Sequence, residues 1–381
     1  MAGARERIAL FDNIKGLLII LVVAAHFMHP VHNDNEALSA LFDITYLFHM
    51  PLFVFVSGLF AKSAYRDGHL NWNRIISFTV LGFAYQTALL AINGVLIEHP
   101  GRLLLFTSAP WYLIGMAWWY LATPLLARLA PSTGVLVSVA IAFASGFFDL
   151  SNGLLAISRS LAFLPYFALG YYLKPAALEQ LVKRRVLWLA VAGAAAIVSL
   201  RLVDVHAYDW FFQMVYGDNP FASAGAVAGI PAGSPAAGAI AKLVTMGIAA
   251  LFSLAVLRLI PRGTSHLTTL GERTLQIYVL HRLIRAALTF RTPFYDLRVS
   301  SIRSGGRRSS WRSQAASSSC ARSRPSPRPS PGSWPNAGYP DNTLTTPPAP
   351  LWGRVTLCRF RYKRTRPQSG ALGSAYAIVR W

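Results

Sequence analysis

The hydrophobic residues of this chain are gathered into long apolar segments separated by short polar stretches. A membrane interior offers no water to the backbone, so each spanning segment must satisfy its own backbone groups as a helix. The pattern therefore predicts an all-α fold, a polytopic transmembrane helix bundle of about nine to ten spans. Nine predicted spans cover residues 14–29, 44–61, 75–96, 110–127, 134–148, 157–173, 186–203, 239–260 and 274–290.

Composition favours a membrane protein over a large soluble one. The 381 residues are 54% hydrophobic and 13% charged, whereas about a quarter of the residues in a typical soluble protein are charged. A secretory signal peptide is the alternative for the first apolar run, but signal peptides precede a mature secreted domain and here more spans follow. We expect an integral membrane protein.

The distribution of basic residues predicts a cytoplasmic N-terminus. With the first span starting inside, Arg5, Arg7 and the basic cluster at residues 183–185 fall on the cytoplasmic side. The longest outside loop, residues 204–238, contains three aspartates and no Lys or Arg. Short loops rich in Lys and Arg mark the cytoplasmic side of a membrane protein.

The chain divides into a transmembrane domain, residues 1–291, and an Arg/Ser/Pro-rich tail, residues 292–381. The tail contains 15 Lys and Arg against two acidic residues, and so supplies most of the net charge of +21. Such a composition buries too little apolar surface to offset chain entropy, so we expect a disordered tail. The abrupt change also fits a reading-frame change, which would make the tail aberrant. An arginine-rich nucleic-acid or anionic-lipid binder is the alternative, but we expect no nucleic-acid partner.

The first span, "DNIKGLLIILVVAAH", contains ionisable residues on one face. Lys15 and His26 differ by about 20° in azimuth on an ideal helix and lie about 16 Å apart along its axis. Asp12 falls on nearly the same face, at the spacing at which it can pair with Lys15. Because charged groups in membranes are costly, the face is a candidate functional site. The alternative is that Lys15 extends to the inner interface.

Histidines recur around the ends of the first two spans. "HFMHPVH" spaces His26, His29 and His32 by three, but Pro30 disturbs the helix and no acidic or sulfur ligand adjoins, so we expect no metal. "YLFHMPLFVFVSG" begins the second span, where the proline after His49 can loosen the helix. His26 and His49 together could form one acid–base site in the outer half, because histidine titrates near neutrality.

Four further residues are candidate substrate-binding positions: Ser57, Trp111, Arg159 and His281. Ser57 stands beside Gly58, where close helix packing is the alternative role. Trp111 begins "WYLIGMAWWY", for which an interfacial aromatic belt is the simpler explanation. Arg159 is expected at the outer mouth of a span, available to an anionic or hydroxyl-rich substrate. His281 lies deeper in the last span, in "LGERTLQIYVLH".

Together, these motifs resemble the acyltransferase-3 family of integral-membrane O-acyltransferases, especially its fucose 4-O-acetylase-like branch. The resemblance covers roughly residues 7–290 and is carried in family order by "FDNIKGLLIILVVAAH", "YLFHMPLFVFVSGLF", "WYLIGMAWWY", "RSLAFLPYFALGYYL" and "LGERTLQIYVLH". It implies a bundle of about ten spans that moves an acyl group, commonly acetyl from cytoplasmic acetyl-CoA, onto a carbohydrate hydroxyl. The implied partners are acyl-CoA, a carbohydrate or glycolipid acceptor and the lipid bilayer.

The resemblance also implies roles for single residues. The family's first helix has an arginine, ten residues and then a histidine, and Lys15 and His26 occupy these positions here. Lysine keeps the charge but lacks the planar fork that grips phosphate. Lys15 with Asp12 would face the acyl donor, while His26 activates the acceptor hydroxyl or relays the acyl group. His49 and Ser57 match the motif of the second span.

Two alternative functions follow from the same residues. A polytopic small-molecule or glycan transporter would also place ionisable residues in a central cavity, and inverted repeats would favour it. No such repeat is evident in the sequence. An inactive truncated remnant of the enzyme is the other alternative, because the tail stands where the family has another span.

Overall fold

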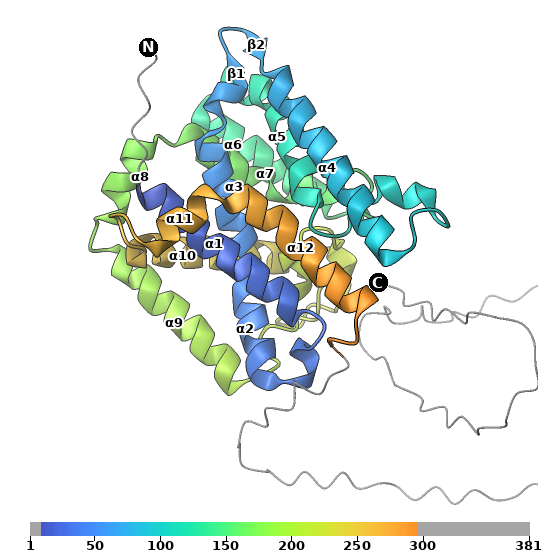
Figure 1. The fold of residues 1–381 in the computed structure, drawn as a ribbon. Helices are drawn as coiled ribbons and strands as arrows, with labels where there is room; N and C mark the ends of the chain where they lie inside the picture. The colour runs from blue at the N-terminus through green and yellow to red at the C-terminus, as the bar shows by residue number, and fades with distance from the viewer. Residues whose placement is uncertain (1–8, 296–381) are drawn as a thin grey trace, which may run out of the picture. The chain divides into compact units, whose positions relative to one another are not determined.

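A computed structural model of the chain describes residues 9–295 and is mostly helical (Figure 1). The predicted tail beyond residue 295 and the basic N-terminal residues lie outside the described residues, so the predictions made for them stay predictions. The long helices are α1 (Ala9–Met28), α4 (Trp72–Asn93), α5 (Trp111–Arg128), α6 (Pro131–Ser145), α7 (Ile157–Tyr172), α9 (Leu187–Val203), α10 (Pro235–Leu259) and α12 (Thr274–Arg291).

Shorter elements connect these helices. The shorter α-helices are α2 (Glu36–Tyr46), α3 (His49–Leu59), α8 (Pro175–Val182) and α11 (His266–Glu272). Single 3₁₀ turns are η1 (His32–Asp34), η2 (Ala61–Ala64), η3 (Pro100–Leu104), η4 (Phe212–Val215) and η5 (Phe221–Ser223). Strands β1 (Tyr65–Arg66) and β2 (His69–Leu70) form an antiparallel hairpin. Each of the nine predicted spans therefore corresponds to one helix, or to the α2–α3 pair.

By length and composition, four helical segments within residues 9–295 are apolar enough to cross a membrane: α1, the α2–α3 pair, α4 and α10. A fifth arises if α8 and α9 form one broken span, since the two helices are bent by 75°. The apolar helices support a membrane protein, while the number of nine to ten spans stays a prediction.

Prolines act differently at the ends of the first two predicted spans. α1 ends at Met28, two residues before Pro30, as the sequence predicts. The expectation that Pro51 loosens a continuous second span is wrong, because the break comes earlier, at Leu47 and Phe48. Pro51 lies in the first turn of α3, where a missing N–H costs no helical hydrogen bond.

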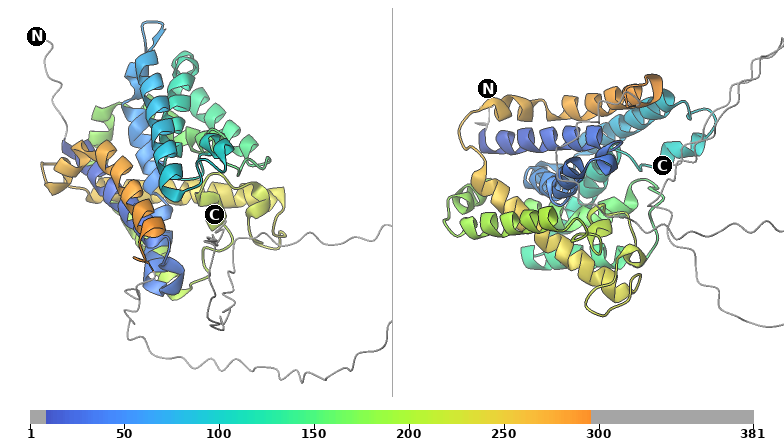
Figure 2. Two further views of the ribbon diagram at one scale, coloured as in Figure 1. Left: turned by 45° about the vertical axis from the view of Figure 1, so that its right-hand side comes forward. Right: turned by 90° about the horizontal axis from the view of Figure 1, so that it is seen from below.

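α1 lies side by side with α11 and α12 (Figures 1 and 2). Two glycines allow this approach: a Cβ on Gly16 would overlap the Leu267 carbonyl, and one on Gly271 would overlap the Asp12 carbonyl. The buried Asn13 side chain ties the start of α1 to the loop before α11. These contacts fix α1 against α11, and because α12 directly follows α11 they influence which side chains of α1 and α12 meet.

The remaining helices pack behind this group. α3 packs on α7, which also contacts α5 and α6, while α4 packs on α5 and α12, and α9 packs on α10. α3 and α7 approach closely because a Cβ on Gly58 would overlap the Phe167 carbonyl and one on Gly170 the Phe55 carbonyl. Aromatic side chains also join α5 to α7, where Trp119 stacks on Phe167 with ring centroids 5.6 Å apart.

Candidate active site

A pair of histidines joins α1 to α12. His26 Nδ1 lies 2.8 Å from His281 Nε2, and the rings stack with centroids 5.0 Å apart. His281 Nδ1 lies 2.9 Å from the Ile277 carbonyl, which can only accept a hydrogen bond. In the neutral pair, His281 therefore donates through Nδ1 and accepts from His26 Nδ1–H at Nε2. This assignment leaves the His26 Nε2 lone pair free to accept a proton.

His26 and His49, which the sequence predicted to share one acid–base site, have different hydrogen-bond partners among the described residues. His49 Nδ1 donates to the Thr45 carbonyl at 2.7 Å, and its ring meets Tyr46 edge-on at 5.0 Å. His49 nevertheless lies within electrostatic range of His26. His281, expected only as a substrate-binding residue, is instead the direct partner of His26.

An aromatic wall extends from the histidine pair to Ser57. Tyr278 contacts His281, with ring centroids 6.1 Å apart, and Tyr112 at 5.7 Å. The Tyr112 hydroxyl lies 2.5 Å from Ser57 Oγ, which also donates to the Phe53 carbonyl. Ser57 thus has a polar role beside the wall rather than a role in helix packing alone.

Trp111 does not belong to a lipid-facing aromatic belt. Trp111 and Tyr112 are only 8% and 9% exposed. Trp111 stacks on Phe163 with centroids 5.4 Å apart, and the Arg159 guanidinium lies 5.6 Å from its ring centre. The belt interpretation is therefore wrong for both residues, because the side chains are buried within the protein.

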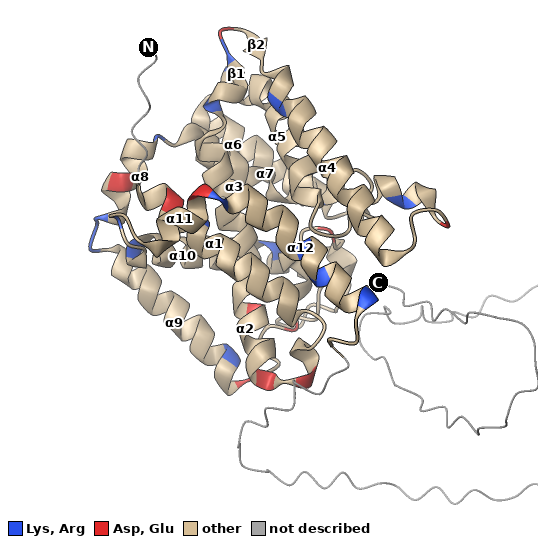
Figure 3. Cartoon of the chain, viewed as in Figure 1, with Lys and Arg blue, Asp and Glu red and all other residues tan. Residues whose placement is uncertain are grey.

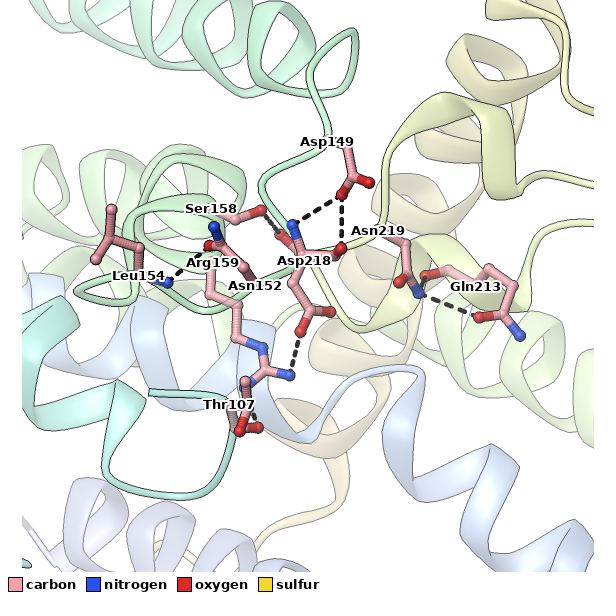
Figure 4. A network of polar contacts seen from close by, with 11 residues as sticks. Thr107, Asp149, Asn152, Leu154, Ser158, Arg159, Gln213, Asp218 and Asn219 are labelled. Carbon is pink, nitrogen blue, oxygen red and sulfur yellow. Dashed lines mark hydrogen bonds and ion pairs between the residues drawn. The ribbon is translucent and has the colours of Figure 1, made fainter. Parts of the chain in front are cut away.

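Arg159 already has protein partners. Its guanidinium forms an ion pair with Asp218, from the loop before α10, and donates to the Thr107 carbonyl (Figure 4). The neighbouring Ser158 hydroxyl donates to the Gly217 carbonyl of the same loop. The expectation of a guanidinium open to substrate thus differs from the structure, in which Arg159 ties α7 to the loop. Burial raises the pKa of Tyr216 in this loop, which keeps its phenol protonated.

Lys15 and Asp12 form the predicted ion pair, with Lys15 Nζ 2.6 Å from Asp12 Oδ1. The Lys15 side chain is 27% exposed, whereas Asp12 is buried. The pair lies near Gly271 of α11, at the opposite end of α1 from His26. Ten residues of helix lie between Lys15 and His26, which places the two about 16 Å apart along the axis. The two sites are distinct centres on one helix.

Sequence reasoning missed two arginines beside the histidines. Arg282 and Arg285 of α12 are 8% and 2% exposed and lie within electrostatic range of His26. Figure 3 shows the positive charge along α12. The signal was present in "HRLIR", which places two arginines inside a predicted span, where charged residues are costly.

The three spaced histidines make different contacts. His26 pairs with His281, while His32 Nδ1 donates to the His29 carbonyl at 2.9 Å and its ring stacks on Phe42 with ring centroids 4.0 Å apart. Among residues 9–295, no group of three His, Cys, Asp or Glu side chains is placed to hold a metal ion. The histidine pair, the two arginines and the Lys15–Asp12 pair are among the polar groups that could contact a ligand.

Comparison with known proteins identifies the family. A family model described as an acyltransferase domain, of the acyltransferase-3 family, matches residues 8–308. Nodulation protein NolL of Sinorhizobium fredii is 48% identical over 64 residues, and that of Mesorhizobium japonicum is 39% identical over 66 residues. Each match covers 16% of this chain and 18% of the relative. No solved structure matches the chain. The chain belongs to the acyltransferase-3 family, and its apolar helices make it a membrane acyltransferase.

Proposed function

We propose that the protein transfers an acetyl group from acetyl-CoA to a hydroxyl of a carbohydrate or glycolipid acceptor, with His26 as the general base. The observation that carries this proposal is the chain from the Ile277 carbonyl through His281 to His26. It is the arrangement of a base oriented by a second group, which acyl-transfer sites use to activate a hydroxyl. The family match favours this reaction over the transporter alternative.

The reaction balances with these groups alone. His26 Nε2 accepts the proton of the acceptor hydroxyl while the hydroxyl oxygen attacks the thioester carbonyl carbon. The carbon–sulfur bond then breaks, and the leaving thiolate receives the proton from the His26 imidazolium. The products are an O-acetyl ester and CoA. His281 is a positioning residue, because it contacts His26 and keeps the His26 proton on Nδ1.

The Lys15–Asp12 pair is proposed to face the donor. A cation there would attract the negative charge of CoA, and its distance of about 16 Å from His26 suits a long donor whose thioester reaches the base. With a cytoplasmic N-terminus, the donor enters from the cytoplasm and the acceptor meets His26 nearer the outer face. This proposal has three further parts. The protein belongs to the fucose 4-O-acetylase-like branch, it is located in the bacterial inner membrane, and residues 1–291 are active without a closing span.

The test is acylation of surface glycan in a strain that lacks the gene. Complementation with the wild-type chain should add the mass of one acetyl group to the glycan, measured by mass spectrometry. His26→Ala should abolish this mass, because general-base assistance is worth about 10² to 10⁴ in rate. His69→Ala is the matched control, since His69 is exposed on β2. Expression is checked by blotting, and full acetylation by a well-expressed His26→Ala chain would contradict the proposal.

A further inference from the structure

Two buried arginines next to His26 have no part in the reaction described above. Arg282 and Arg285 stand three residues apart on α12, so their side chains share one face of the helix. Both are nearly inaccessible, and both lie within electrostatic range of His26. The Arg285 guanidinium lies 6.0 Å from the ring centre of Tyr295. Two like charges are thus held close together, away from water and beside the proposed base.

Arg282 has a buried hydrogen-bond donor with no acceptor among the described residues. Its Nε donates to Ser108 Oγ at 3.2 Å, but its Nη1 is buried with no hydrogen-bond partner among the described residues. Within residues 9–295, Arg282 also forms no ion pair with a carboxylate. Two other largely buried arginines, Arg159 and Arg201, each pair with an aspartate. Arg282 differs from them in this respect.

A buried cation is costly unless an anion compensates it. The guanidinium fork matches the oxygens of a carboxylate or phosphate group, and charge-assisted bonds of this type are among the strongest in proteins. We propose that Arg282, with Arg285 adding to the local positive charge, binds an anionic group of the acceptor. The acceptor class is thus an acidic carbohydrate, one that carries a carboxylate or a phosphate near the acylated hydroxyl. This inference rests on the proposed function.

The position of the arginines along the helices assigns them to the acceptor. The Gly271 end of α11 lies against Asp12, and His281 lies against His26. Arg282 and Arg285 follow His281 along α12, so they lie at the His26 end of α1. The proposed donor-facing Lys15 is at the other end. An anion bound by Arg282 would therefore be presented to His26 from the acceptor side.

The test measures ligand binding by the purified full chain in detergent. Glucuronate and glucose 1-phosphate are the charged probes, glucose is the neutral control, and CoA reports on the donor site. The wild-type chain should be stabilised against thermal unfolding by the charged sugars and not by glucose. Arg282→Gln should weaken that binding by about 10- to 100-fold, the effect of losing a charge-assisted contact, and leave CoA binding unchanged.

Two variants make the outcome specific. Arg273→Gln removes the same charge from an exposed position at the start of α12 and should bind the charged sugars as the wild type does. Arg282→Lys keeps the charge without the fork and should bind with intermediate affinity. His26→Ala should retain anion binding, so loss of the reaction and loss of this site are told apart.

Three results would overturn the inference. The first is that glucose stabilises the wild-type chain against thermal unfolding as much as the charged sugars do. This comparison needs no variant, so it tests the inference even if Arg282→Gln fails to fold. Alternatively, Arg282→Gln would bind the charged sugars unchanged. Finally, loss of CoA binding in Arg282→Gln, with sugar binding intact, would place the arginine in the donor site.

Discussion

Substitution of Asn13 should uncouple α1 from the segment that leads into α12. Asn13 is fully buried. Its Nδ2 donates to the carbonyls of Pro261 and Gly263 at 2.8 and 2.7 Å. Its Oδ1 accepts from the hydroxyls of Ser265 and Thr268 at 2.8 and 2.7 Å. One side chain thus makes four hydrogen bonds that link the first helix to α11 and to the loop before it.

The expected cost of Asn13→Ala follows from these bonds. A typical intramolecular hydrogen bond contributes about 0.5 to 1.5 kcal/mol net, so two donated and two accepted bonds amount to about 2 to 6 kcal/mol. Residues 261–264 are exposed, so water can hydrate the carbonyls that are released. The loss should therefore fall in the lower half of the range, at about 3 kcal/mol. For a chain of this size that lowers the unfolding temperature by about 6 °C.

Thermal unfolding of the purified chain in detergent measures this loss. Asn35→Ala is the matched control, because Asn35 caps α2 with a single bond to the Leu38 N–H at 3.1 Å. A cap of this kind is worth about 1 kcal/mol, or about 2 °C. Asn13→Ala should also slow acyl transfer, since His26 lies on α1 and His281 lies on α12, which directly follows the α11 segment that Asn13 holds against α1. A temperature shift no larger than that of Asn35→Ala would refute the reasoning.

Substitutions at three further positions, Lys15, Asp218 and Gly58, test other contacts. Lys15→Ala should raise the KM for acyl-CoA while Lys15→Arg retains most activity, as measured by initial rates at varied donor concentration; equal effects of the two would contradict a charge role. Asp218→Asn leaves the Arg159 guanidinium without its counter-ion and should cost about 3 kcal/mol in thermal unfolding. Gly58→Val would overlap the Phe167 backbone and should cost about 1 to 3 kcal/mol, whereas Gly101→Val, in open space, should be neutral.

The helices were largely predictable because their signal is local. Apolar runs bounded by polar residues located α1, α4, α5, α6, α7, α9, α10 and α12 within a few residues. Pro30 marked the end of α1, whereas the break at Leu47 and Phe48 has no proline or glycine of its own. The apolar runs themselves carry no information on how helices bend, and α8 illustrates this, because it is a separate short helix bent by 75° from α9.

The site was predictable only where its partners share one helix. Asp12 and Lys15 follow from a three-residue spacing, and the structure has their ion pair. The partner of His26 lies 255 residues away in the chain. Its identity depends on how α12 lies against α1, and the close approach of α1 to the preceding helix α11 at Gly16 and Gly271 is encoded by no local pattern. The burial of Trp111 likewise depends on packing between helices.

Acyl transfer by a set of histidine variants tests the central claim most directly. The measurement is the initial rate of transfer from radiolabelled acetyl-CoA to host glycan in membrane vesicles, with protein amounts matched. His26→Ala should lower the rate by about 10² to 10⁴, and His281→Ala by a smaller factor. Because His281 is proposed to act through His26, the double variant should be no slower than His26→Ala alone. A double variant slowed by the product of the two single effects, or a His26→Ala chain with the wild-type rate, would contradict the account.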